Sequence, residues 1–433
     1  MTQTNAKSGL TPEPQIEIDA LSYGPYGIGR LGGKAVMIPN TAPGDAVVAR
    51  ITENKERYAI GAIERLIRPS PLRQIPPCPY AGRCGGCSWQ HIQYDAQLKA
   101  KEQSVADALR RIGKLAGFEL KPIIRSGDSY HYRRRIRLQV GRGPSLGFYG
   151  AASHELVEID ACLIAAEHLN AVIEPVRRWL GNLATTIDHV ELATGDEPDE
   201  IVIIARATDR FIPRDQPVCE QLLGAAESIR GLVMLGQDWR ETWGHTAITV
   251  RLSGELSLKL DADVFTQVNA EGNRQMLSRL LAAGNFHGRD HVLELFCGAG
   301  NFTLPVATLV EEIVAVDGYR PAIASGKLNA QKNALENIRW ISSSVPQTVA
   351  QLKRQKKSFS KIVLDPPRAG AKGIEADLAA LGAEMICYIS CNPTTLARDV
   401  AALANHGYKL HTVQPIDFFP HTFHVESLAV LMR

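Results

Sequence analysis

Four of the eight cysteines do not have the spacing of a metal site, and one of these four, Cys391, is in a position that suits a catalytic nucleophile. Cys391 lies in a polar segment, residues 390–393, directly after a predicted strand. A thiol in a polar loop can be exposed and ionised, and a thiolate is a strong nucleophile. A lone cysteine is more often a small buried apolar residue, and we interpret Cys219, Cys297 and Cys387 in that way. Cys391 is therefore the candidate nucleophile, with a buried structural thiol as the alternative.

The other four cysteines have the spacing of a metal site. Cys78, Cys84 and Cys87 share a loop rich in proline and glycine, and Cys162 follows far downstream. In a reducing cytosol such cysteines favour metal binding or catalysis over disulfides. Four thiolates can hold a tetrahedral zinc ion or a four-iron cluster. The spacing departs from the common ferredoxin pattern and does not choose between them.

A glycine loop is the candidate nucleoside site. Gly298 and Gly300 follow a predicted strand and open a helix, and Asp317 ends the next strand. Glycine allows close approach of a ligand, and an acidic residue at that place can bind ribose hydroxyls. The third glycine of the dinucleotide fingerprint is absent, which favours S-adenosylmethionine over NAD because no pyrophosphate needs a cradle. A strand–helix turn that merely requires glycine is the alternative.

Two further segments carry ionisable side chains. Asp365-Pro366-Pro367-Arg368 follows a predicted strand. Methyltransferases acting on exocyclic amines carry a similar motif that ends in an aromatic residue, so Arg368 argues against that substrate; an ordinary proline turn is the alternative. Glu426 precedes the predicted final strand, residues 427–431, in a stretch dense in aromatic, histidine and acidic residues. A strand can hold this carboxylate rigidly, although such a stretch can also be plain surface.

Strands must position these residues. After residue 265, apolar strand-like runs alternate with helical stretches, which predicts an α/β Rossmann-like, doubly wound and mostly parallel sheet. Ligands bind beyond the carboxyl ends of such strands, and Asp317, Asp365 and Cys391 each lie at such an end. The predicted strands are residues 292–296, 313–317, 361–365 and 385–390.

The preceding part of the chain predicts two other folds. Short β-prone runs over residues 16–67, separated by glycine turns, are typical of a five-stranded barrel of the oligonucleotide-binding kind. A proline-rich connector, residues 69–77, marks a boundary. An amphipathic helix over residues 95–116 and strand-rich stretches at 132–159 and 189–260 then predict a central α+β domain. The glycines expected in turns are Gly24, Gly27, Gly29, Gly32 and Gly33, and the expected buried face of the helix is Leu98, Val105, Leu109 and Ile112.

Composition narrows the function class. The chain is 45% hydrophobic and 22% charged, with no uninterrupted apolar run long enough to span a membrane and no apolar segment within residues 1–15, so we expect a cytoplasmic protein. Its net charge of +2 hides an uneven distribution. Residues 99–142 hold 12 Lys/Arg against 4 Asp/Glu, whereas residues 155–200 hold 2 against 11. The basic block, which includes the run Arg133-Arg134-Arg135, favours a nucleic-acid partner over a merely solvated face. Neutralising that run is expected to flatten the salt dependence of RNA affinity.

Taken together, these segments resemble the bacterial (uracil-5)-methyltransferases of 23S ribosomal RNA that carry an iron–sulfur cluster. The resemblance implies a TRAM-like RNA-binding barrel over residues 10–68, a central α+β domain with the cluster loop over 69–265, and an S-adenosylmethionine-dependent catalytic domain over 266–433. The matching segments are Phe265–Asn269, Glu294–Asn301, Asp365–Arg368, Ser390–Pro393 and His424–Glu426, with the four grouped cysteines.

The resemblance also implies the ligands. The cofactor would contact or border six residues, with Asp317 at the ribose and Asp365 between the cofactor and the target base. A 4Fe-4S cluster, rather than zinc, would sit on Cys78, Cys84, Cys87 and Cys162. We expect the metal to organise the RNA-binding region rather than to do redox chemistry. The six residues are Gln267, Phe296, Asn301, Asp317, Ser344 and Asp365.

The implied reaction is methylation of C5 of a uridine in 23S rRNA, the one that the family numbers 1939. Because C5 is a poor nucleophile, the thiolate of Cys391 adds at C6, C5 takes the methyl group, and Glu426 removes the C5 proton before Cys391 leaves. This mechanism predicts that the pKa of Cys391 lies below the ordinary ~8.5. The expected partner is 23S rRNA, without a membrane or an obligate protein partner, and the expected state is a monomer.

Two alternative functions remain, one enzymatic and one non-catalytic. One is a uracil-5 methyltransferase for transfer RNA or for another ribosomal uridine, and the four cysteines and the barrel argue against the transfer-RNA branch. The other is a non-catalytic, metal-containing RNA-binding factor that keeps a methyltransferase fold, and the presence of both Cys391 and Glu426 argues against it.

Overall fold

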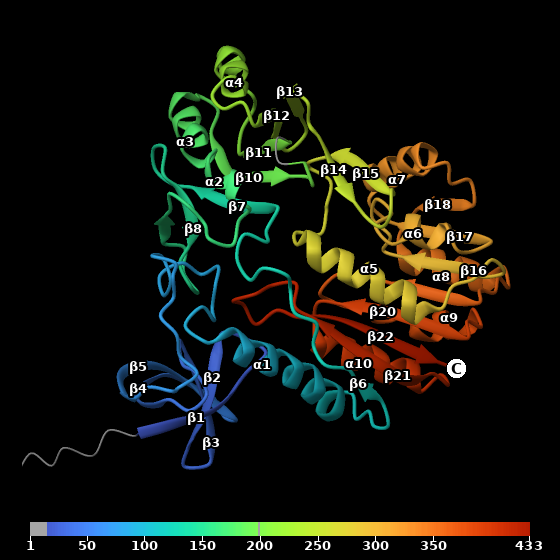
Figure 1. Cartoon of the computed structure of the whole chain (residues 1–433), viewed down its shortest axis with the longest axis horizontal. Coiled ribbons are helices and arrows are strands. Elements are labelled where there is room, and N and C mark those ends of the chain that lie inside the picture. Colours follow the sequence, from blue (N-terminus) through green and yellow to red (C-terminus); the bar gives the residue numbers. More distant parts are fainter. Residues whose placement is uncertain (1–14, 198–199) are drawn as a thin grey trace, which may run out of the picture. The chain divides into compact units, whose positions relative to one another are not determined.

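The computed structural model describes residues 15–197 and 200–433, so the predictions for residues 1–14 lie outside the described residues. The chain forms two compact units, whose elements Figure 1 labels. Among the described residues, the smaller unit comprises residues 15–82, 87–100 and 421–423. The larger unit comprises residues 83–86, 101–420 and 424–433.

A closed five-stranded barrel forms the smaller unit's core. Its strand order is β1-β2-β3-β5-β4, in which only β3 and β5 are parallel partners. Alternate apolar side chains, among them Ile16, Ile38 and Val47, fill the interior. The predicted barrel is confirmed. Its strands are β1 (Gln15–Leu21), β2 (Tyr26–Leu31), β3 (Lys34–Pro39), β4 (Ala46–Asn54) and β5 (Tyr58–Arg68).

Strand β2 corrects the sequence interpretation, because two glycines expected in turns lie inside it. A Cβ atom on Gly29 would lie 2.3 Å from the carbonyl oxygen of Glu17, and one on Gly27 would lie 2.1 Å from Oγ1 of Thr41. These glycines therefore permit close approach of neighbouring backbone and side chains in a small barrel. The turn itself uses the pair 32–33, both with positive φ.

Helix α1 (Tyr94–Asp107) continues into a π-helical turn over Ala108–Ile112. Leu98, Val105 and Leu109 are buried as predicted, but Ile112 is 51% exposed. A π-turn contains more residues per turn than an α-helix, so it rotates the following residues off the predicted face. The prediction of a regular helix to residue 116 is wrong for this reason.

A seven-stranded sheet confirms the central α+β domain. Its order is β13-β12-β11-β10-β7-β8-β9, with β11 and β12 parallel and the other pairs antiparallel. The strands are β7 (Arg135–Val140), β8 (Leu146–Tyr149), β9 (Leu156–Glu158), β10 (Ile187–Thr194), β11 (Ile201–Ala207), β12 (Ile229–Leu235) and β13 (Arg240–Gly244). The accompanying helices are α2 (Glu167–Asn170), α3 (Ile173–Asn182) and α4 (Gln216–Leu223), with a 3-10 turn at Pro213–Asp215.

An eight-stranded sheet of order β18-β17-β16-β19-β20-β22-β21-β6 carries the candidate site. Strands β16 to β20 are parallel neighbours, and β22 is antiparallel to both β20 and β21. The strands are β6 (Glu119–Leu120), β16 (His291–Leu295), β17 (Glu312–Asp317), β18 (Ile338–Ser342), β19 (Lys361–Leu364), β20 (Met385–Ser390), β21 (Lys409–Ile416) and β22 (Glu426–Met432).

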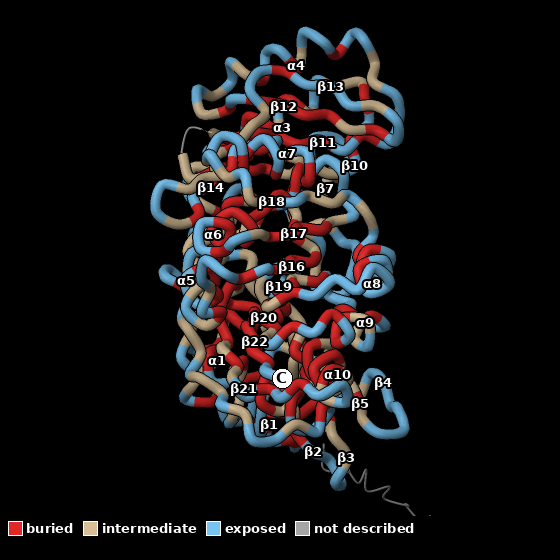
Figure 2. The backbone as a smooth tube through the Cα atoms, turned by 90° about the vertical axis from the view of Figure 1, so that its right-hand side faces the viewer, coloured by how far each residue is buried: buried red, intermediate tan, exposed pale blue. Residues whose placement is uncertain are grey.

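Helices cover both faces of this sheet, which confirms the doubly wound prediction. Figure 2 shows the buried strands as a red column, with α5 and α6 on one side and α8, α9 and α10 on the other. The helices are α5 (Ala270–Gly284), α6 (Thr303–Ala307), α7 (Arg320–Lys332), α8 (Val345–Arg354), α9 (Glu375–Ala380) and α10 (Pro393–Ala404).

A two-stranded hairpin, β14 (Ala247–Arg251) and β15 (Ser257–Asp261), lies between β13 and β16 in the chain. Its buried side chains Val250 and Leu258 belong to the same apolar cluster as residues of the eight-stranded sheet, such as Val292 and Ile389. The hairpin therefore packs with the eight-stranded sheet, although the predicted central domain included it. The predicted domain limits stay predictions.

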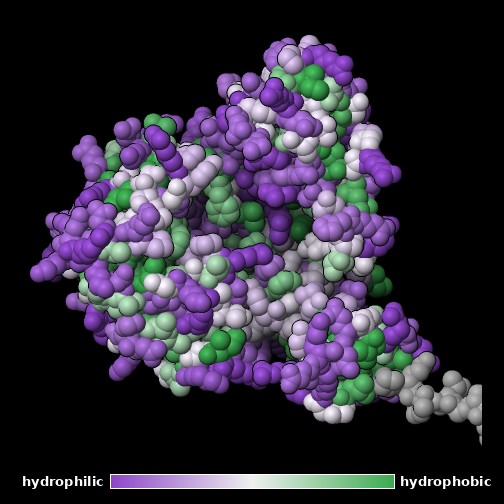
Figure 3. Space-filling view, turned by 180° about the vertical axis from the view of Figure 1, so that it is seen from behind, coloured by the Kyte–Doolittle hydropathy of each residue, from purple (hydrophilic) through white to green (hydrophobic). Residues whose placement is uncertain are grey.

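The larger unit's surface is mostly hydrophilic on the face drawn in Figure 3, which is hollowed near its middle where apolar side chains show. Within residues 15–197 and 200–433, every helix is too short or too polar to cross a bilayer.

Candidate active site

The predicted site residues gather at one edge of the eight-stranded sheet. Asp317 ends β17, Asp365 directly follows β19, and Cys391 directly follows β20. Glu426 reaches the same edge from the opposite chain direction, because it begins β22, which is antiparallel to β20. The pairing of Ser390 with Ser427 places the residues that flank that pair, Cys391 and Glu426, side by side in sequence register. Strand topology thus joins two residues far apart in the chain.

The glycine loop after β16 adopts backbone conformations that few side chains tolerate. Phe296, Gly298 and Gly300 have φ values of +63°, +55° and +97°. A Cβ atom on Gly300 would lie 2.5 Å from Leu304, whereas one on Gly298 would meet nothing within 4 Å. Gly300 is thus required by packing, and Gly298 leaves open space beside its backbone. Such a loop allows a ligand to approach the main chain closely.

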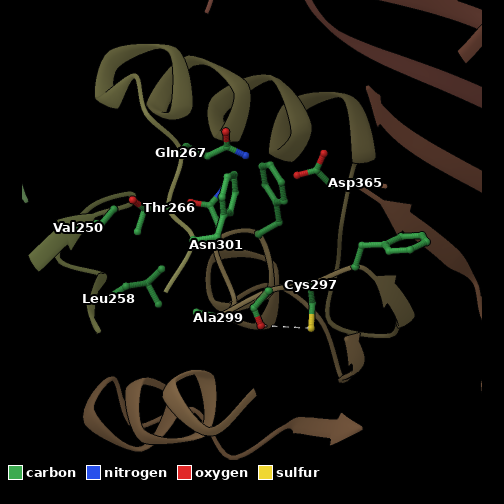
Figure 4. A pocket seen from close by; sticks show the side chains of 12 residues that line it. Val250, Leu258, Thr266, Gln267, Cys297, Ala299, Asn301 and Asp365 are labelled. Carbon is green, nitrogen blue, oxygen red and sulfur yellow. Dashed lines mark hydrogen bonds between the residues drawn. The ribbon is translucent and has the colours of Figure 1, made fainter. Parts of the chain in front are cut away.

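A pocket of about 460 Å3, including its open mouth, lies beside this loop. Four of the predicted cofactor contacts line it: Gln267, Phe296, Asn301 and Asp365. Figure 4 shows the side chains of Gln267 and Asp365 on the same side of the pocket, below α5. The remaining lining residues are Val250, Leu258, Phe265, Thr266, Cys297, Gly298, Ala299 and Phe302.

Sequence reasoning missed the apolar wall that Val250 and Leu258 contribute from the β14–β15 hairpin. Their alternation in a short β-prone run signals a strand but not the ligand that it faces. It also missed Asn273 on α5, which is fully buried. The side-chain amides of Asn273 and Asn301 bond each other reciprocally, at 2.8 and 2.9 Å between nitrogen and oxygen. This pair ties the glycine loop to α5.

The other two predicted cofactor contacts lie outside the lining. The carboxylate of Asp317 accepts hydrogen bonds from the backbone N–H of Gly298 at 3.0 Å and of Tyr319 at 2.7 Å, so it adjoins the glycine loop. Ser344 precedes α8, and its carbonyl oxygen accepts the N–H of Thr348 at 3.0 Å. The structure therefore brings Asp317 to the edge of the pocket and assigns Ser344 to the start of a helix.

Burial raises the pKa of three carboxyl groups in this region, so that each ionises at a higher pH than a free carboxyl group. It raises the pKa of Asp365 to about 7. It raises the pKa of Glu294 in β16 to about 8, with the charges of Asp365 and Asp317 adding to the effect of burial. The pKa of Glu426 rises well above its ordinary value because of burial and the charge of Asp365. Clustered groups with raised pKa values are a mark of functional sites.

Cys391 contradicts one prediction. Burial raises the pKa of its thiol to about 11, and the charges of Glu426 and Asp365 act in the same direction while Arg368 opposes them. The expected pKa below ~8.5 is wrong because the thiol is half-buried beside two carboxyl groups.

Arg368 is the cation that opposes these effects, since its charge lowers the pKa of both Cys391 and Glu426. Its carbonyl oxygen accepts hydrogen bonds from Nδ2 of Asn392 at 3.3 Å and from Oγ1 of Thr395 at 3.2 Å. The Asp365–Arg368 turn is thus tied to the first turn of α10, which follows Cys391. It is not merely a proline turn.

Two of the three arginines in the basic run are largely buried against acidic partners, which contradicts a fully exposed phosphate-binding run. The Arg134 side chain is 4% exposed and lies 3.4 Å from the carboxylate of Asp196. The Arg135 side chain is 15% exposed and lies 3.4 Å from Glu191. The acidic block therefore neutralises these two cations inside the central domain. Substituting the run would disturb folding, so the predicted change in salt dependence cannot be assigned to phosphate contacts.

The grouped cysteines, like Cys391, differ in exposure from the three cysteines expected in the core. Cys78, Cys84, Cys87 and Cys162 are all partly exposed, whereas Cys219, Cys297 and Cys387 are buried as predicted. The backbone N–H of Gly86 donates to the sulfur of Cys84 at 3.4 Å. Cys78 and Cys87 belong to the smaller unit, and Cys84 and Cys162 to the larger. Among the described residues, no three His, Cys, Asp or Glu side chains are grouped so as to hold a metal ion.

Comparison with known proteins gives the family. A model described as tRNA (Uracil-5-)-methyltransferase matches residues 246–433, and a TRAM domain model matches residues 14–63. The 23S rRNA (uracil(1939)-C(5))-methyltransferase RlmD of Pectobacterium atrosepticum is 35% identical over 98% of this chain and 94% of its own length. The protein of the same name from Salmonella typhi is 34% identical over 99% of both chains.

A solved structure supports the fold. The tRNA (uracil-54, C5)-methyltransferase of Pyrococcus abyssi, in complex with S-adenosyl-L-homocysteine, superimposes with a TM-score of 0.74 at 22% identity. The match covers 97% of this chain and 100% of that one. With its TRAM barrel, its α/β catalytic sheet and relatives that match nearly its whole length, the chain belongs to the family of S-adenosylmethionine-dependent RNA uracil-C5 methyltransferases.

Proposed function

We propose that this enzyme methylates C5 of one uridine in 23S rRNA, at the position that the names of its relatives number 1939. The observation that carries the proposal is the placement of Cys391 and Glu426 at one sheet edge, beside a pocket with a glycine loop. The relatives' names support the ribosomal substrate. The cytoplasm, where ribosomal RNA is modified in bacteria, would be its place of action.

Mapping of 5-methyluridine tests this proposal. We expect ribosomal RNA from cells that lack the protein to lose the modification at that single position, and expression of the wild-type protein to restore it. Loss of 5-methyluridine from transfer RNA, or at a different ribosomal position, would contradict the assigned substrate. Retention of all sites would contradict the activity in cells.

S-adenosylmethionine fits the pocket by the chemistry of its lining. Gly298 leaves space beside the main chain, Phe296 offers an aromatic ring, and Gln267 and Asn301 offer amides. Asp317 adjoins the loop where ribose hydroxyls would bind, and Asp365 lies in the lining on the side of Cys391. When bound, the cofactor supplies the methyl group. Ser344 stays a weaker candidate contact because it begins α8 outside the lining.

The chain's own residues perform the covalent steps. The thiolate of Cys391 forms a bond to C6 of the uracil, which makes C5 an enolate carbon that takes the methyl group. Glu426, as carboxylate, then accepts the proton that leaves C5, and the C6–sulfur bond breaks to restore the C5–C6 double bond. The target base must leave its stack to reach both groups, at a cost of a few kcal/mol.

The rate of methylation is expected to rise with pH between about pH 6 and pH 9. Both essential groups act in their deprotonated forms, and both have pKa values raised above the ordinary range, Cys391 to about 11 and Glu426 in the same direction. The active fraction therefore grows as protons are removed. Single-turnover rates on a 23S rRNA fragment would show this rise, and a rate that falls over this range would contradict the assignments.

We also propose that Cys78, Cys84, Cys87 and Cys162 hold a 4Fe-4S cluster. Their partial exposure and the N–H donor to the Cys84 sulfur support a site for a sulfur-ligated metal. No step of the methyl transfer requires its redox chemistry.

Anaerobic purification tests the cluster. We expect about four iron and four sulfide per chain and a broad visible absorption that the Cys162→Ala variant loses. Cys219→Ala, which removes a buried thiol elsewhere, should keep both. Zinc in place of iron, or no metal under anaerobic conditions, would contradict the assignment.

A further inference from the structure

A fully buried ion pair joins the first helix to the segment that leads to Glu426. Nζ of Lys101 on α1 lies 2.6 Å from Oδ1 of Asp417, which follows β21, and both side chains are 0% exposed. The two residues are 316 positions apart in the chain. Neither belongs to the pocket lining, and the proposed reaction uses neither of them.

The pair fixes the backbone that follows it. Nζ of Lys101 also donates to the carbonyl oxygen of Phe419 at 2.9 Å. The N–H of Phe419 donates back to Oδ1 of Asp417 at 3.1 Å. Two side chains and two backbone groups thus form one network that ties Lys101 to residues 417–419, and these groups satisfy one another in this arrangement.

A second contact holds the same stretch. Nδ2 of Asn269 donates to the carbonyl oxygen of Phe418 at 2.9 Å, while its Oδ1 accepts the N–H of Gly272 at 2.9 Å as the N-cap of α5. Asn269 follows the pocket residue Gln267 by two positions. The segment after Asp417 is therefore anchored to the helix that borders the pocket.

An aromatic contact connects residues 417–419 to the segment that carries Glu426. The Phe419 ring lies 5.8 Å from that of His424 in an edge-to-face contact. His424 precedes Glu426 by two residues, and the charge of Lys101 is among those that lower the pKa of His424. A shift of Phe419 would thus be transmitted to the residues that carry the carboxylate.

Stability alone does not explain a buried pair. The cost of removing two charges from water commonly cancels their attraction, and apolar pairs of similar size often stabilise as well or better. What such a pair does provide is a single arrangement, since any other leaves a charge buried without a partner. We propose that Lys101, through Asp417 and Phe419, is a positioning residue for Glu426. The inference rests on the proposed role of Glu426 as the base.

Variants of the pair test this proposal in the full-length holoenzyme. Lys101→Met removes the charge at similar length, Asp417→Asn keeps the acceptor for Phe419, and the double variant removes both charges. Lys99→Met, exposed on the same helix, is the matched control. For each, one measures kcat, KM for an rRNA fragment, melting temperature, and the fraction of enzyme bound covalently to RNA on a denaturing gel.

We expect Lys101→Met to lower kcat by about 10- to 100-fold, the scale of a misplacement of about 1 Å, with KM within twofold. Covalent enzyme–RNA adduct should accumulate, because a misplaced base slows loss of the C5 proton. The double variant should regain melting temperature relative to Lys101→Met but not kcat. Lys99→Met should resemble the wild type.

Three results would overturn the proposal: recovery of kcat together with stability in the double variant, a wild-type kcat in Lys101→Met, or loss of activity without adduct. Each would make the pair purely structural. Failure of the proposed role of Glu426 as the base gives a different result. In that case the Glu426→Gln variant would itself form no adduct and would keep its methylation activity. The double variant keeps the test decisive if Lys101→Met does not fold.

Discussion

Alanine in place of Cys391 is expected to lower methylation of a 23S rRNA fragment by more than about 10,000-fold, the scale seen when a catalytic nucleophile is removed. Without addition of the thiolate at C6, C5 of uracil is not an enolate carbon and does not attack the methyl group. The fold should persist, because Cys391 lies in a loop after β20 and is only half-buried. Transfer of a radiolabelled methyl group to RNA measures the loss.

The matched control is Cys387→Ala, which removes a buried thiol from β20, the strand that ends just before Cys391. It should lower the free energy of unfolding slightly through the small cavity that it leaves, yet keep covalent chemistry. Binding of S-adenosylmethionine, measured by calorimetry, should be unchanged in Cys391→Ala. Methylation at the wild-type rate by Cys391→Ala would remove the nucleophile assignment.

Glutamine in place of Glu426 should trap the enzyme on its RNA. Turnover is expected to fall by about 100- to 10,000-fold, the usual contribution of a general base. Addition to C6 and methyl transfer do not require this base, whereas loss of the C5 proton does. The C6–sulfur bond therefore persists, and a covalent complex that survives denaturation should accumulate. Gel mobility and mass spectrometry would identify it as a methylated adduct.

Glutamine is a fair substitute because burial raises the pKa of Glu426 well above its ordinary value, so that the protein accommodates a neutral side chain there. The melting temperature should accordingly stay close to that of the wild type. The double variant Cys391→Ala, Glu426→Gln should form no adduct, which assigns the bond to Cys391. Absence of adduct in Glu426→Gln with a fully active thiol would contradict the base assignment.

The local sequence was enough to predict strands whose pattern depends only on neighbouring residues. Alternating apolar residues placed the barrel strands, and apolar runs ending in polar residues located β16, β17, β19 and β20. The sequence pattern did not reveal β2, because glycines that permit close packing cannot be distinguished in sequence from glycines that form turns. It also missed the π-turn that exposes Ile112.

What the sequence by itself determined is the chemistry available: a thiol after one strand, a carboxylate at the start of another, and a glycine loop earlier in the chain. Only the tertiary structure determined which ionisable side chains lie close to one another. Antiparallel pairing of β20 with β22 brought Glu426 to Cys391, and burial together with the charge of Glu426 raises the pKa of that thiol. Folding of the central domain paired Arg134 and Arg135 with acidic partners. The reason is physical: residue type and spacing are local properties, whereas burial and Coulomb interactions depend on distances between residues far apart in the chain.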